Sequence, residues 1–301
     1  MALFGGYMLD KNFEKIDSSL IEEICNAFEI DYNFDSLRKK YPNIEYNVLY
    51  SILFSRGKYT RELYNSLFQY TINNDKVLII SDTHYGSVFE NMSYTYDAFD
   101  FAIANGIHIV LHGGDVLEAN VNPQIGFDSI RQATHFVERY PSDKSIINYA
   151  LLGNHDLQAA KEDKEVMEIL SSRDDINLLG FKKAYFKWCQ SIISLQHEIE
   201  EYKLFLPTSA EYLCFRGHSH FYHIREKKRG KNERIFIPAM CDNPMQNLAN
   251  NSYVKSQKII VKPGFLIAQI DDSSIVVSNY AFDDGKIIRE NEYEKALKRK
   301  L

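Results

Sequence analysis

Side chains able to bind metal ions follow five apolar segments of the chain, each at the point where the segment ends. They occur in the stretches SDTH, GGD, GNHD, QHE and GHSH, which follow apolar runs such as KVLII and YALL. The candidate metal ligands are Asp82, His84, Asp115, Asn154, His197, His218 and His220. Carboxylate, amide and imidazole groups without a thiolate suit divalent transition-metal ions better than calcium. We expect manganese, with iron, zinc or nickel as the alternatives.

This collection of side chains predicts a pair of metal ions. Two cations held about 3.5 to 4 Å apart need an anionic bridge between them, which a single aspartate can supply. Asp115 is the expected bridge, because Gly113 and Gly114 before it allow a tight turn and leave room beside the ions. Asp82 and His84 are two positions apart, so in extended chain both side chains point to one face, and the two histidines of GHSH do the same.

The segments that must position these ligands alternate between strands and helices from Lys76 onward. Apolar strands are predicted at KVLIIS, HIVLHG, NYALLG, SIISLQ, YLCFRG and RIFIPA, with helical patterns at YDAFDFAIAN, FDSIRQATHFVERY and KEDKEVMEILSS. This alternation predicts an α/β fold. In such a fold the carboxyl ends of the strands lie along one rim, so we expect the candidate ligands to meet in one crevice. After Ser256, the stops DDSS and DDG predict hairpins.

The chain before this region has a different pattern. Between Asp17 and Asn73 the apolar residues are spaced as in helices, and the last such segment is TRELYNSLFQYTI. We therefore expect a small helical unit over residues 1–73 and a larger domain over residues 74–301. With 301 residues and 45% hydrophobic content, the chain can bury a large core.

The composition argues against several classes of partner. The formal net charge is −6 and both signs are mixed along the chain, which disfavours a general coat for nucleic acid or anionic membranes. Every apolar run falls short of the roughly 20 residues of a membrane span. The four cysteines show no paired short spacing, so neither a disulfide framework nor a thiolate metal site is expected. We expect a cytoplasmic protein with reduced thiols and no membrane partner.

The ordered motifs DTH, GGD, GNHD, a histidine at a strand end and GHSH resemble the signature of the calcineurin-like metallophosphoesterase superfamily. The resemblance covers about residues 76 to 240. It implies a four-layer α-β-β-α sandwich with a dinuclear metal site at its rim. Carried over by motif, one ion would be held by Asp82, His84, Asp115 and His220. The other would be held by Asp115, Asn154, His197 and His218.

The resemblance also implies a reaction. A hydroxide that bridges the two ions would attack phosphorus in line with the leaving group. His155 would protonate the departing oxygen or stabilise phosphoryl charge, and Asp156 would help to orient His155. The expected substrate is a phosphate ester, with a phosphodiester preferred over a monoester. The chain lacks the arginine of the GDxxDRG pattern found in phosphoprotein phosphatases, which disfavours a phosphoserine phosphatase.

Two alternatives to a small-molecule phosphodiesterase stay open. The segments FDSLRKKYP and YNVLYSILFSRGK have the spacing of a helix-turn-helix, with Arg56, Lys58 and Arg61 near its exit, which would suit a metal-dependent nuclease that holds nucleic acid. Against this, residues 1 to 73 carry eight Lys or Arg and ten Asp or Glu. Packing or oligomerisation is therefore the preferred role of the helical unit. The other alternative is a non-catalytic metal-binding scaffold, which would have no need of a proton donor such as His155.

Overall fold

The computed structural model of the protein describes most of the chain from residue 70 onward and part of the chain before it. The residues described are 16–31, 37, 39–44, 48–49, 52–53, 56, 70–119, 127–181, 183–189, 191–197, 212–225, 233–242, 252–257, 259 and 261–297. They fall into two compact units, the second of which begins at Tyr70. The placement of a domain boundary after residue 73 stays a prediction.

The first unit contains helix α1 (Ser18–Asp31), at the first helix predicted from the sequence. Asp17 caps this helix, since its Oδ1 accepts a hydrogen bond from the backbone N–H of Ser19 at 2.8 Å. Ile24 and Phe28 on the buried face pack into a small apolar cluster. The two segments with helix-turn-helix spacing lie largely outside the described residues, including Lys58 and Arg61.

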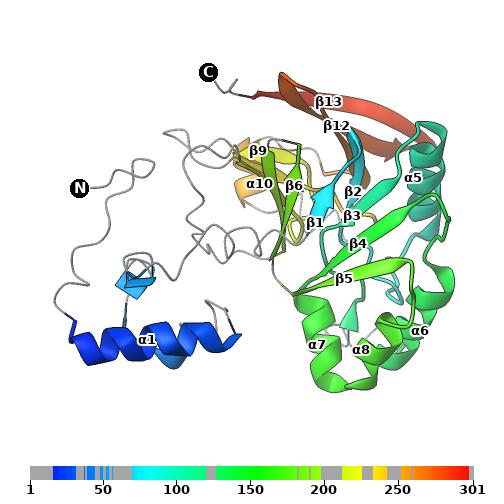
Figure 1. Ribbon diagram of the computed structural model, residues 1–301. Helices are drawn as coiled ribbons and strands as arrows, with labels where there is room; N and C mark the ends of the chain where they lie inside the picture. Colours follow the sequence, from blue (N-terminus) through cyan, green and yellow to red (C-terminus); the bar gives the residue numbers. More distant parts are fainter. Residues whose placement is uncertain are drawn as a thin grey trace. The chain divides into compact units, whose positions relative to one another are not determined.

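The second unit is a mixed α/β fold built on two sheets (Figure 1). Its described strands are β1 (Tyr70–Ile72), β2 (Lys76–Ile80), β3 (Ile109–His112), β4 (Ile147–Leu152), β5 (Ile176–Phe181), β6 (Lys183–Trp188), β7 (Ser191–Gln196), β8 (Tyr212–Arg216), β9 (His223–Arg225), β10 (Glu233–Phe236), β11 (Gly264–Ile270), β12 (Ser274–Asp283) and β13 (Lys286–Ala296). Its described helices are α5 (Met92–Ala104), α6 (Ser129–Arg139), α7 (Asn154–Glu162), α8 (Glu165–Leu170) and α10 (Ser252–Gln257). Among these residues, one sheet has the strand order β13-β12-β11-β2-β3-β4-β5 and the other β1-β6-β7-β8-β10-β9.

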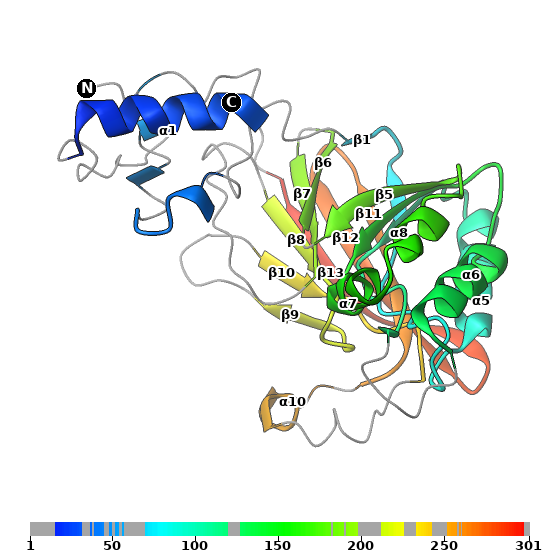
Figure 2. The ribbon, with the colours of Figure 1, turned by 90° about the horizontal axis from the view of Figure 1, so that it is seen from below.

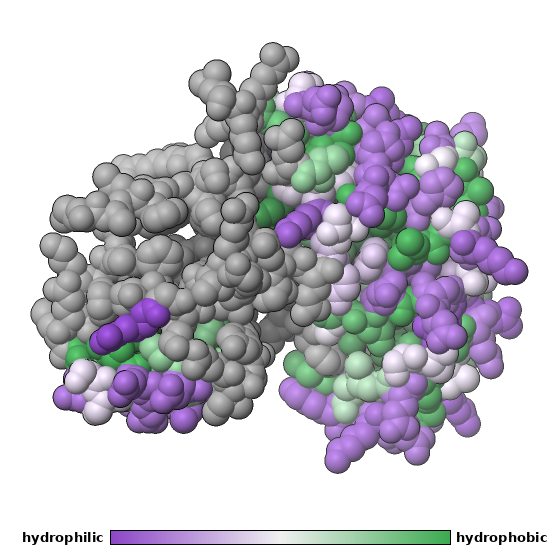
Figure 3. All heavy atoms as spheres, in the orientation of Figure 1, coloured by the Kyte–Doolittle hydropathy of each residue, from purple (hydrophilic) through white to green (hydrophobic). Residues whose placement is uncertain are grey.

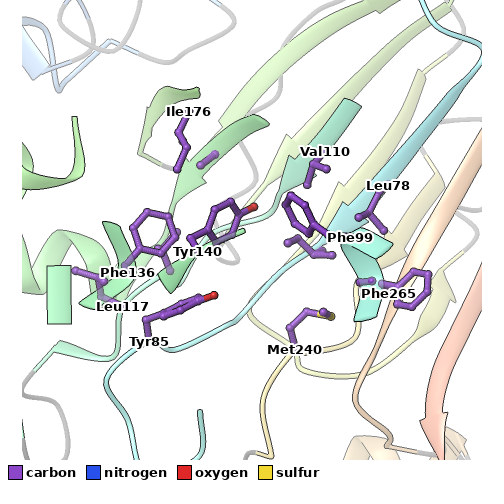
Figure 4. Close-up of a cluster of buried hydrophobic side chains, with 14 of the residues drawn as sticks. Leu78, Tyr85, Phe99, Val110, Leu117, Phe136, Tyr140, Ile176, Met240 and Phe265 are labelled. Atoms are coloured by element: carbon purple, nitrogen blue, oxygen red, sulfur yellow. The ribbon is translucent and has the colours of Figure 1, made fainter. Parts of the chain in front are cut away.

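The alternation of side chains along β2 explains why apolar residues pack on both faces of the seven-stranded sheet. Val77 and Ile79 belong to a core shared with the six-stranded sheet, which lies beside it in Figure 2. Leu78 and Ile80 point the other way, into a core with α5, α6, α7 and α8. Figure 4 shows this second core, where Leu78 lies near Phe99 of α5. The seven-stranded sheet therefore lies between a helical layer and the other sheet.

Helix α10 covers part of the outer face of the six-stranded sheet. On β10, Ile235 belongs to the core between the sheets, so the next residue, Phe236, points to the opposite face. There it packs with Val254 of α10 and with Phe221. The layers are therefore helix, sheet, sheet and helix, which confirms the fold that the resemblance implied.

The directions of the strands bring the predicted site together. Strands β2, β3 and β4 are parallel to one another, and so are β7, β8 and β10. Parallel neighbours end at the same edge of a sheet, so the segments that follow β2, β3 and β4 leave one edge together. The same holds for the segments that follow β7 and β8.

Some elements differ from the sequence-based expectation. Tyr70–Ile72, which have the spacing of a last helical turn, form β1 and pair in parallel with β6. Strands β5 and β6 and helix α7 were not expected. Residues 226–232 lie outside the described residues, and β9 and β10 on either side of them pair antiparallel.

In the view of Figure 3, the described surface of the second unit is largely hydrophilic, with hydrophobic residues scattered between the polar ones. Such scattering is usual for a surface in contact with water. None of the helices in the described part of the chain combines the length and the apolar character that a membrane crossing requires.

Candidate metal centre

All seven predicted metal ligands lie together at the edge where strands of the two sheets end. The seven-stranded sheet contributes the residues after β2, β3 and β4, namely Asp82, His84, Asp115 and Asn154. The six-stranded sheet contributes those after β7 and β8, namely His197, His218 and His220. Most of these side chains are buried, and Asn154 and His218 are half-buried. The sequence motifs thus mark one place in the fold.

The first group of ligand atoms surrounds His84. Its Nε2 lies 3.3 Å from Nε2 of His220, which in turn lies 3.2 Å from Oδ1 of Asp82. Asp82, His84 and Asp115 each offer a ligand atom within 4.8 Å of the others. Two imidazole nitrogens that face each other next to carboxylates suit a shared cation better than a hydrogen bond between the rings.

The second group of ligand atoms surrounds Asn154. Its Oδ1 lies 2.9 Å from Nδ1 of His218 and 3.2 Å from Nε2 of His197. The same nitrogen of His197 lies 3.0 Å from Oδ2 of Asp115. Nδ1 of His197 donates to the carbonyl of Gly113 at 2.7 Å, which leaves Nε2 as the atom that faces the site. Asp115 thus belongs to both groups of ligands.

The backbone at these ligands is in an uncommon conformation. Among the described residues, eight that are not glycine have a positive φ, and five of the eight are predicted ligands. These five are Asp82 (54°), His84 (47°), Asp115 (52°), His218 (71°) and His220 (59°). Non-glycine residues adopt this left-handed region rarely, and they gather there mostly at functional sites. The packing around the site therefore holds the ligands in place at some cost in backbone strain.

Glycines next to the ligands allow close approach of the chain segments. A Cβ atom at Gly153 would lie 2.2 Å from Oδ1 of Asp115, and one at Gly114 would lie 2.5 Å from Nδ1 of His197. Side chains cannot come that close to fixed neighbours. Gly114 also has a φ of 104°, which L-residues rarely adopt. The glycines before Asp115 and Asn154 are thus required by the site itself.

The site contains two buried carboxylates and histidines that can carry the compensating positive charge. Asp82 and Asp115 are 0% and 1% exposed. Burial by itself would raise the pKa of Asp115, but the charge of His197 lowers it to about 2. Burial by itself would lower the pKa of His197, but the charge of Asp115 raises it to about 9. Two buried carboxylates this close need positive charge between them, so the donor set fits divalent cations.

A buried chain of hydrogen bonds lies under the loops that carry the first ligands. The backbone N–H of Gly114 donates to Nδ1 of His112 at 3.2 Å, so the proton of this ring is on Nε2. That nitrogen lies 3.0 Å from Oγ1 of Thr83, whose hydroxyl donates to the carbonyl of Val116. Burial lowers the pKa of His112 to about 3, which keeps the ring neutral. His112 therefore joins the loop after β2 to the loop after β3 as a structural residue.

Beside the ligands, the ring of His155 is fixed by one nitrogen and free at the other. Nδ1 lies 2.6 Å from the carbonyl oxygen of Glu118. Because a carbonyl only accepts, Nδ1 carries a proton and donates it. Nε2 lies 3.9 Å from Oδ2 of Asp115, on the side of the ligands. The ring therefore presents one exchangeable nitrogen to the site.

Glu118 is a site residue that the sequence analysis missed. Its carboxylate Oε2 lies 2.6 Å from Nδ1 of His84, without the alignment of a hydrogen bond, and its Oε1 lies 4.0 Å from Nδ1 of His155. A carboxylate behind a histidine ligand orients the ring and strengthens it as a donor. Its position three residues after Asp115 was the available signal, because both lie on the same loop.

Asp156 acts on the backbone of the site. Its Oδ2 accepts hydrogen bonds from the N–H groups of Gly153 at 2.7 Å and Val116 at 3.1 Å, and its Oδ1 accepts one from Leu117 at 2.8 Å. These bonds tie the start of α7 to the loop after Asp115. The ring of His155 instead contacts the carbonyl of Glu118. Any effect of Asp156 on the orientation of His155 is thus transmitted through the backbone.

A two-sheet α/β sandwich with a candidate metal centre at its rim defines a class of protein, and comparison with known families identifies the family. The family model described as calcineurin-like phosphoesterase matches residues 75–263, well over half of the chain. The chain therefore belongs to the calcineurin-like phosphoesterase family.

Solved structures with a similar fold are distant in sequence. They include a dimetal phosphatase from Danio rerio, with a TM-score of 0.46 and 10% identity over 74% of this chain and 99% of that chain. Vacuolar protein sorting 29 from Cryptosporidium parvum has a TM-score of 0.43 and 15% identity over 74% of this chain and 98% of that chain. A search of curated proteins finds no match.

Proposed function

We propose that the protein hydrolyses phosphodiesters with the aid of two divalent metal ions. Membership of the calcineurin-like phosphoesterase family supports a hydrolase that acts on phosphate esters. The observation that carries the proposal is the meeting of two groups of ligand atoms that share Asp115, with the free nitrogen of His155 beside them.

The distances support the two ligand sets that the resemblance implies. These are Asp82, His84, Asp115 and His220 for one ion and Asp115, Asn154, His197 and His218 for the other. Two ligand atoms about 2.1 Å from one ion, at right angles to each other, lie about 3 Å apart. The described ligand atoms approach one another to between 2.9 and 3.3 Å. When bound, the ions would supply an acidified water as nucleophile and would neutralise charge on the phosphoryl oxygens.

His155 is the proposed general acid. Its Nδ1 is committed to the carbonyl of Glu118, so Nε2 is the atom that can give a proton to the leaving oxygen. The side chain is 17% exposed, which leaves it in reach of a bound substrate. A metal-binding scaffold would have no use for this nitrogen, so its placement supports an enzyme.

The side chains at the site favour a diester as the substrate. The described residues that form the two groups are acidic, amide or imidazole groups, and no lysine or arginine is among them. A phosphomonoester carries close to two negative charges and a diester carries one. These ligand groups add no lysine or arginine charge for a dianion, which supports the diester.

The test is hydrolysis of bis(p-nitrophenyl) phosphate by full-length protein loaded with manganese or zinc, compared with p-nitrophenyl phosphate. We expect turnover of the diester to exceed that of the monoester and to stop after dialysis against a chelator. The nuclease alternative is tested by including single-stranded and double-stranded DNA as substrates in the same screen. If no phosphate ester is cleaved by protein that holds two ions per chain, the scaffold alternative replaces the proposal.

Replacement of the proposed acid separates chemistry from metal binding. We expect His155→Ala to retain both ions and to lower kcat on the diester by about 10² to 10⁴-fold, the usual contribution of a general acid. The matched control is His108→Ala, because Nδ1 of His108 contacts the exposed carbonyl of Ser145 away from the ligands. Metal content by mass spectrometry and turnover are measured on both variants. Unchanged turnover in His155→Ala would remove this residue from the mechanism.

A further inference from the structure

The side chain of Cys241 reaches the candidate metal centre, although the sequence gives no sign of a thiol ligand. Its sulfur and one ring nitrogen each of His84 and His220 all lie within 4.8 Å of one another. Cys241 is fully buried and forms no disulfide. Its side chain and that of His220 are hydrogen-bond partners. The thiol thus lies beside two of the proposed ligands of a single ion.

The backbone around Cys241 is fixed against the loops of the site. The N–H of Met240 donates to the carbonyls of Ser81 at 3.0 Å and Asp82 at 3.3 Å. On the other side, the N–H of Asp242 donates to the carbonyl of Phe89 at 2.8 Å. Residue 241 itself forms an isolated antiparallel bridge with Glu90. These bonds hold position 241 next to the loop that carries the first ligands.

The direction of the side chain follows from this arrangement. Met240 points into the core under α5, where Figure 4 shows it near Phe265. The sulfur of Cys241, by contrast, lies at the ligands, within 4.8 Å of a ring nitrogen of His84 and of His220. A thiol beside two imidazole nitrogens has the chemistry of a metal ligand.

We propose that Cys241 binds the ion held by His84 and His220 through its sulfur, and that this ligand gives one of the two sites a preference for zinc or iron(II) over manganese. The inference rests on the proposed metal centre. On binding, the sulfur–metal bond forms as the thiol releases its proton to solvent. A soft thiolate ligand favours zinc and iron, while sites of carboxylates and carbonyl groups favour manganese.

Cobalt(II) is the probe, because it occupies zinc sites and its absorption reports the ligands. Full-length protein is loaded with cobalt(II), and its visible ligand-field bands and near-ultraviolet thiolate-to-cobalt charge-transfer band are recorded. We expect both in the unaltered protein, and we expect Cys241→Ser to keep the ligand-field bands and lose the charge-transfer band. Cys214→Ser is the matched control, because Cys214 is equally buried and lies on β8. This variant should keep both bands.

A competition experiment measures the preference. With equal manganese and zinc supplied, we expect Cys241→Ser to lose at least about tenfold of the selectivity for zinc at one site, the size of effect usual for changes around a metal. Ligand-field bands without a charge-transfer band in the unaltered protein, or a band that survives in Cys241→Ser, would overturn the role of Cys241 and leave the metal centre intact. Absence of all cobalt bands would instead overturn the proposed metal centre, and this inference with it.

Discussion

At the scale of single residues, the site depends on the missing Cβ atom of a glycine as much as on the candidate ligands. Gly153 precedes Asn154, and a Cβ atom there would lie 2.2 Å from the carboxylate of Asp115 and 2.5 Å from its backbone nitrogen. The backbone nitrogen is fixed in the chain, and the same carboxylate oxygen is held by a hydrogen bond from the backbone N–H of His155 at 3.0 Å. The absence of a Cβ at position 153 is therefore a condition for Asp115 to stand between the two ligand groups.

We predict that Gly153→Ala displaces Asp115 and lowers the metal content from two ions to fewer than one per chain. Turnover of the diester should fall with it. The measurement is metal stoichiometry by mass spectrometry, with the melting temperature of each variant recorded alongside.

The control is Gly106→Ala, where a Cβ would meet no atom within 4 Å but φ is +67°. That substitution carries the strain of the left-handed region, roughly 1 to 2 kcal/mol, without a collision in the site. It should therefore lower stability and keep both ions. Two ions per chain in Gly153→Ala would show that Asp115 can move without loss of the centre.

At this scale, sequence alone identifies the candidate ligands but not all of the residues behind them. Asp82, His84 and Asp115 are readable because each follows an apolar strand. Cys241 is not, because it lies on a segment without its own motif and meets His84 only when chain segments far apart in sequence pack together. Glu118 follows the GGD motif, but its contact with His84 also depends on that packing. The left-handed backbone at the ligands also follows from tertiary packing, since no turn motif predicts it.

At the scale of secondary structure elements, Arg173 anchors the end of α6 to the start of β5. Its Nη1 donates to the carbonyl of Tyr140 at 2.6 Å, and its Nη2 donates to the carbonyl of Pro141 at 3.2 Å. Its Nε donates to Oδ1 of Asp175 at 2.8 Å, and this hydrogen bond lowers the pKa of Asp175. The guanidinium also lies 5.6 Å from the centre of the Tyr140 ring. Nη1 also donates to the carbonyl of Val137 at 3.3 Å, one of the carbonyls that the end of α6 leaves open, so one side chain binds both the helix end and the segment after it.

We predict that Arg173→Ala lowers the free energy of unfolding by about 2 to 4 kcal/mol, because several charge-assisted hydrogen bonds are lost together. The free energy of unfolding of Arg173→Lys should lie between those of the unaltered protein and Arg173→Ala, since lysine keeps the charge and loses the planar guanidinium group. The measurement is urea unfolding followed by circular dichroism. Arg131→Ala is the control, because that side chain is 70% exposed and its ion pair should contribute less than about 1 kcal/mol. Equal losses in the two alanine variants would contradict the anchoring role.

Helices and strands could be predicted where the local sequence pattern determines their conformation. They were missed where contacts with distant parts of the chain determine it. β7 occupies the predicted apolar run SIISLQ, and the turns before β12 and β13 occupy the predicted stops. Helix α7 was missed because its first residues, Asn154 and His155, also belong to the site motif. β1 was missed because its three residues have helical spacing, while pairing with β6 determines their conformation.

At the scale of the whole molecule, β1 decides where the second unit begins. Ile72 is 1% exposed and belongs to the core between the sheets, and β1 extends the six-stranded sheet beside β6. We predict that a chain of residues 70–301 is more stable than one of residues 74–301 by at least about 1.5 to 3 kcal/mol, from the burial of Ile72 alone.

Urea unfolding of the two shortened chains measures the difference. Both retain Asn74, whose carbonyl accepts a hydrogen bond from Nε1 of Trp188 at 2.7 Å, so the comparison isolates β1. Both also keep every proposed ligand and should cleave the diester. Equal stability of the two chains would support a domain boundary after residue 73, as the sequence predicts.

The proposed ions would be shared between two separately hydrogen-bonded sheets. One sheet supplies the two aspartates, His84 and Asn154, and the other supplies His197, His218 and His220. Sliding of one sheet over the other by a single ångström would pull these ligand atoms apart while leaving each sheet's own hydrogen bonds in place. Warming should accordingly release the metal and stop turnover before circular dichroism registers any loss of strands. Conversely, metal binding at the rim would stabilise the contact between the two sheets. The melting temperature would therefore rise with the concentration of metal.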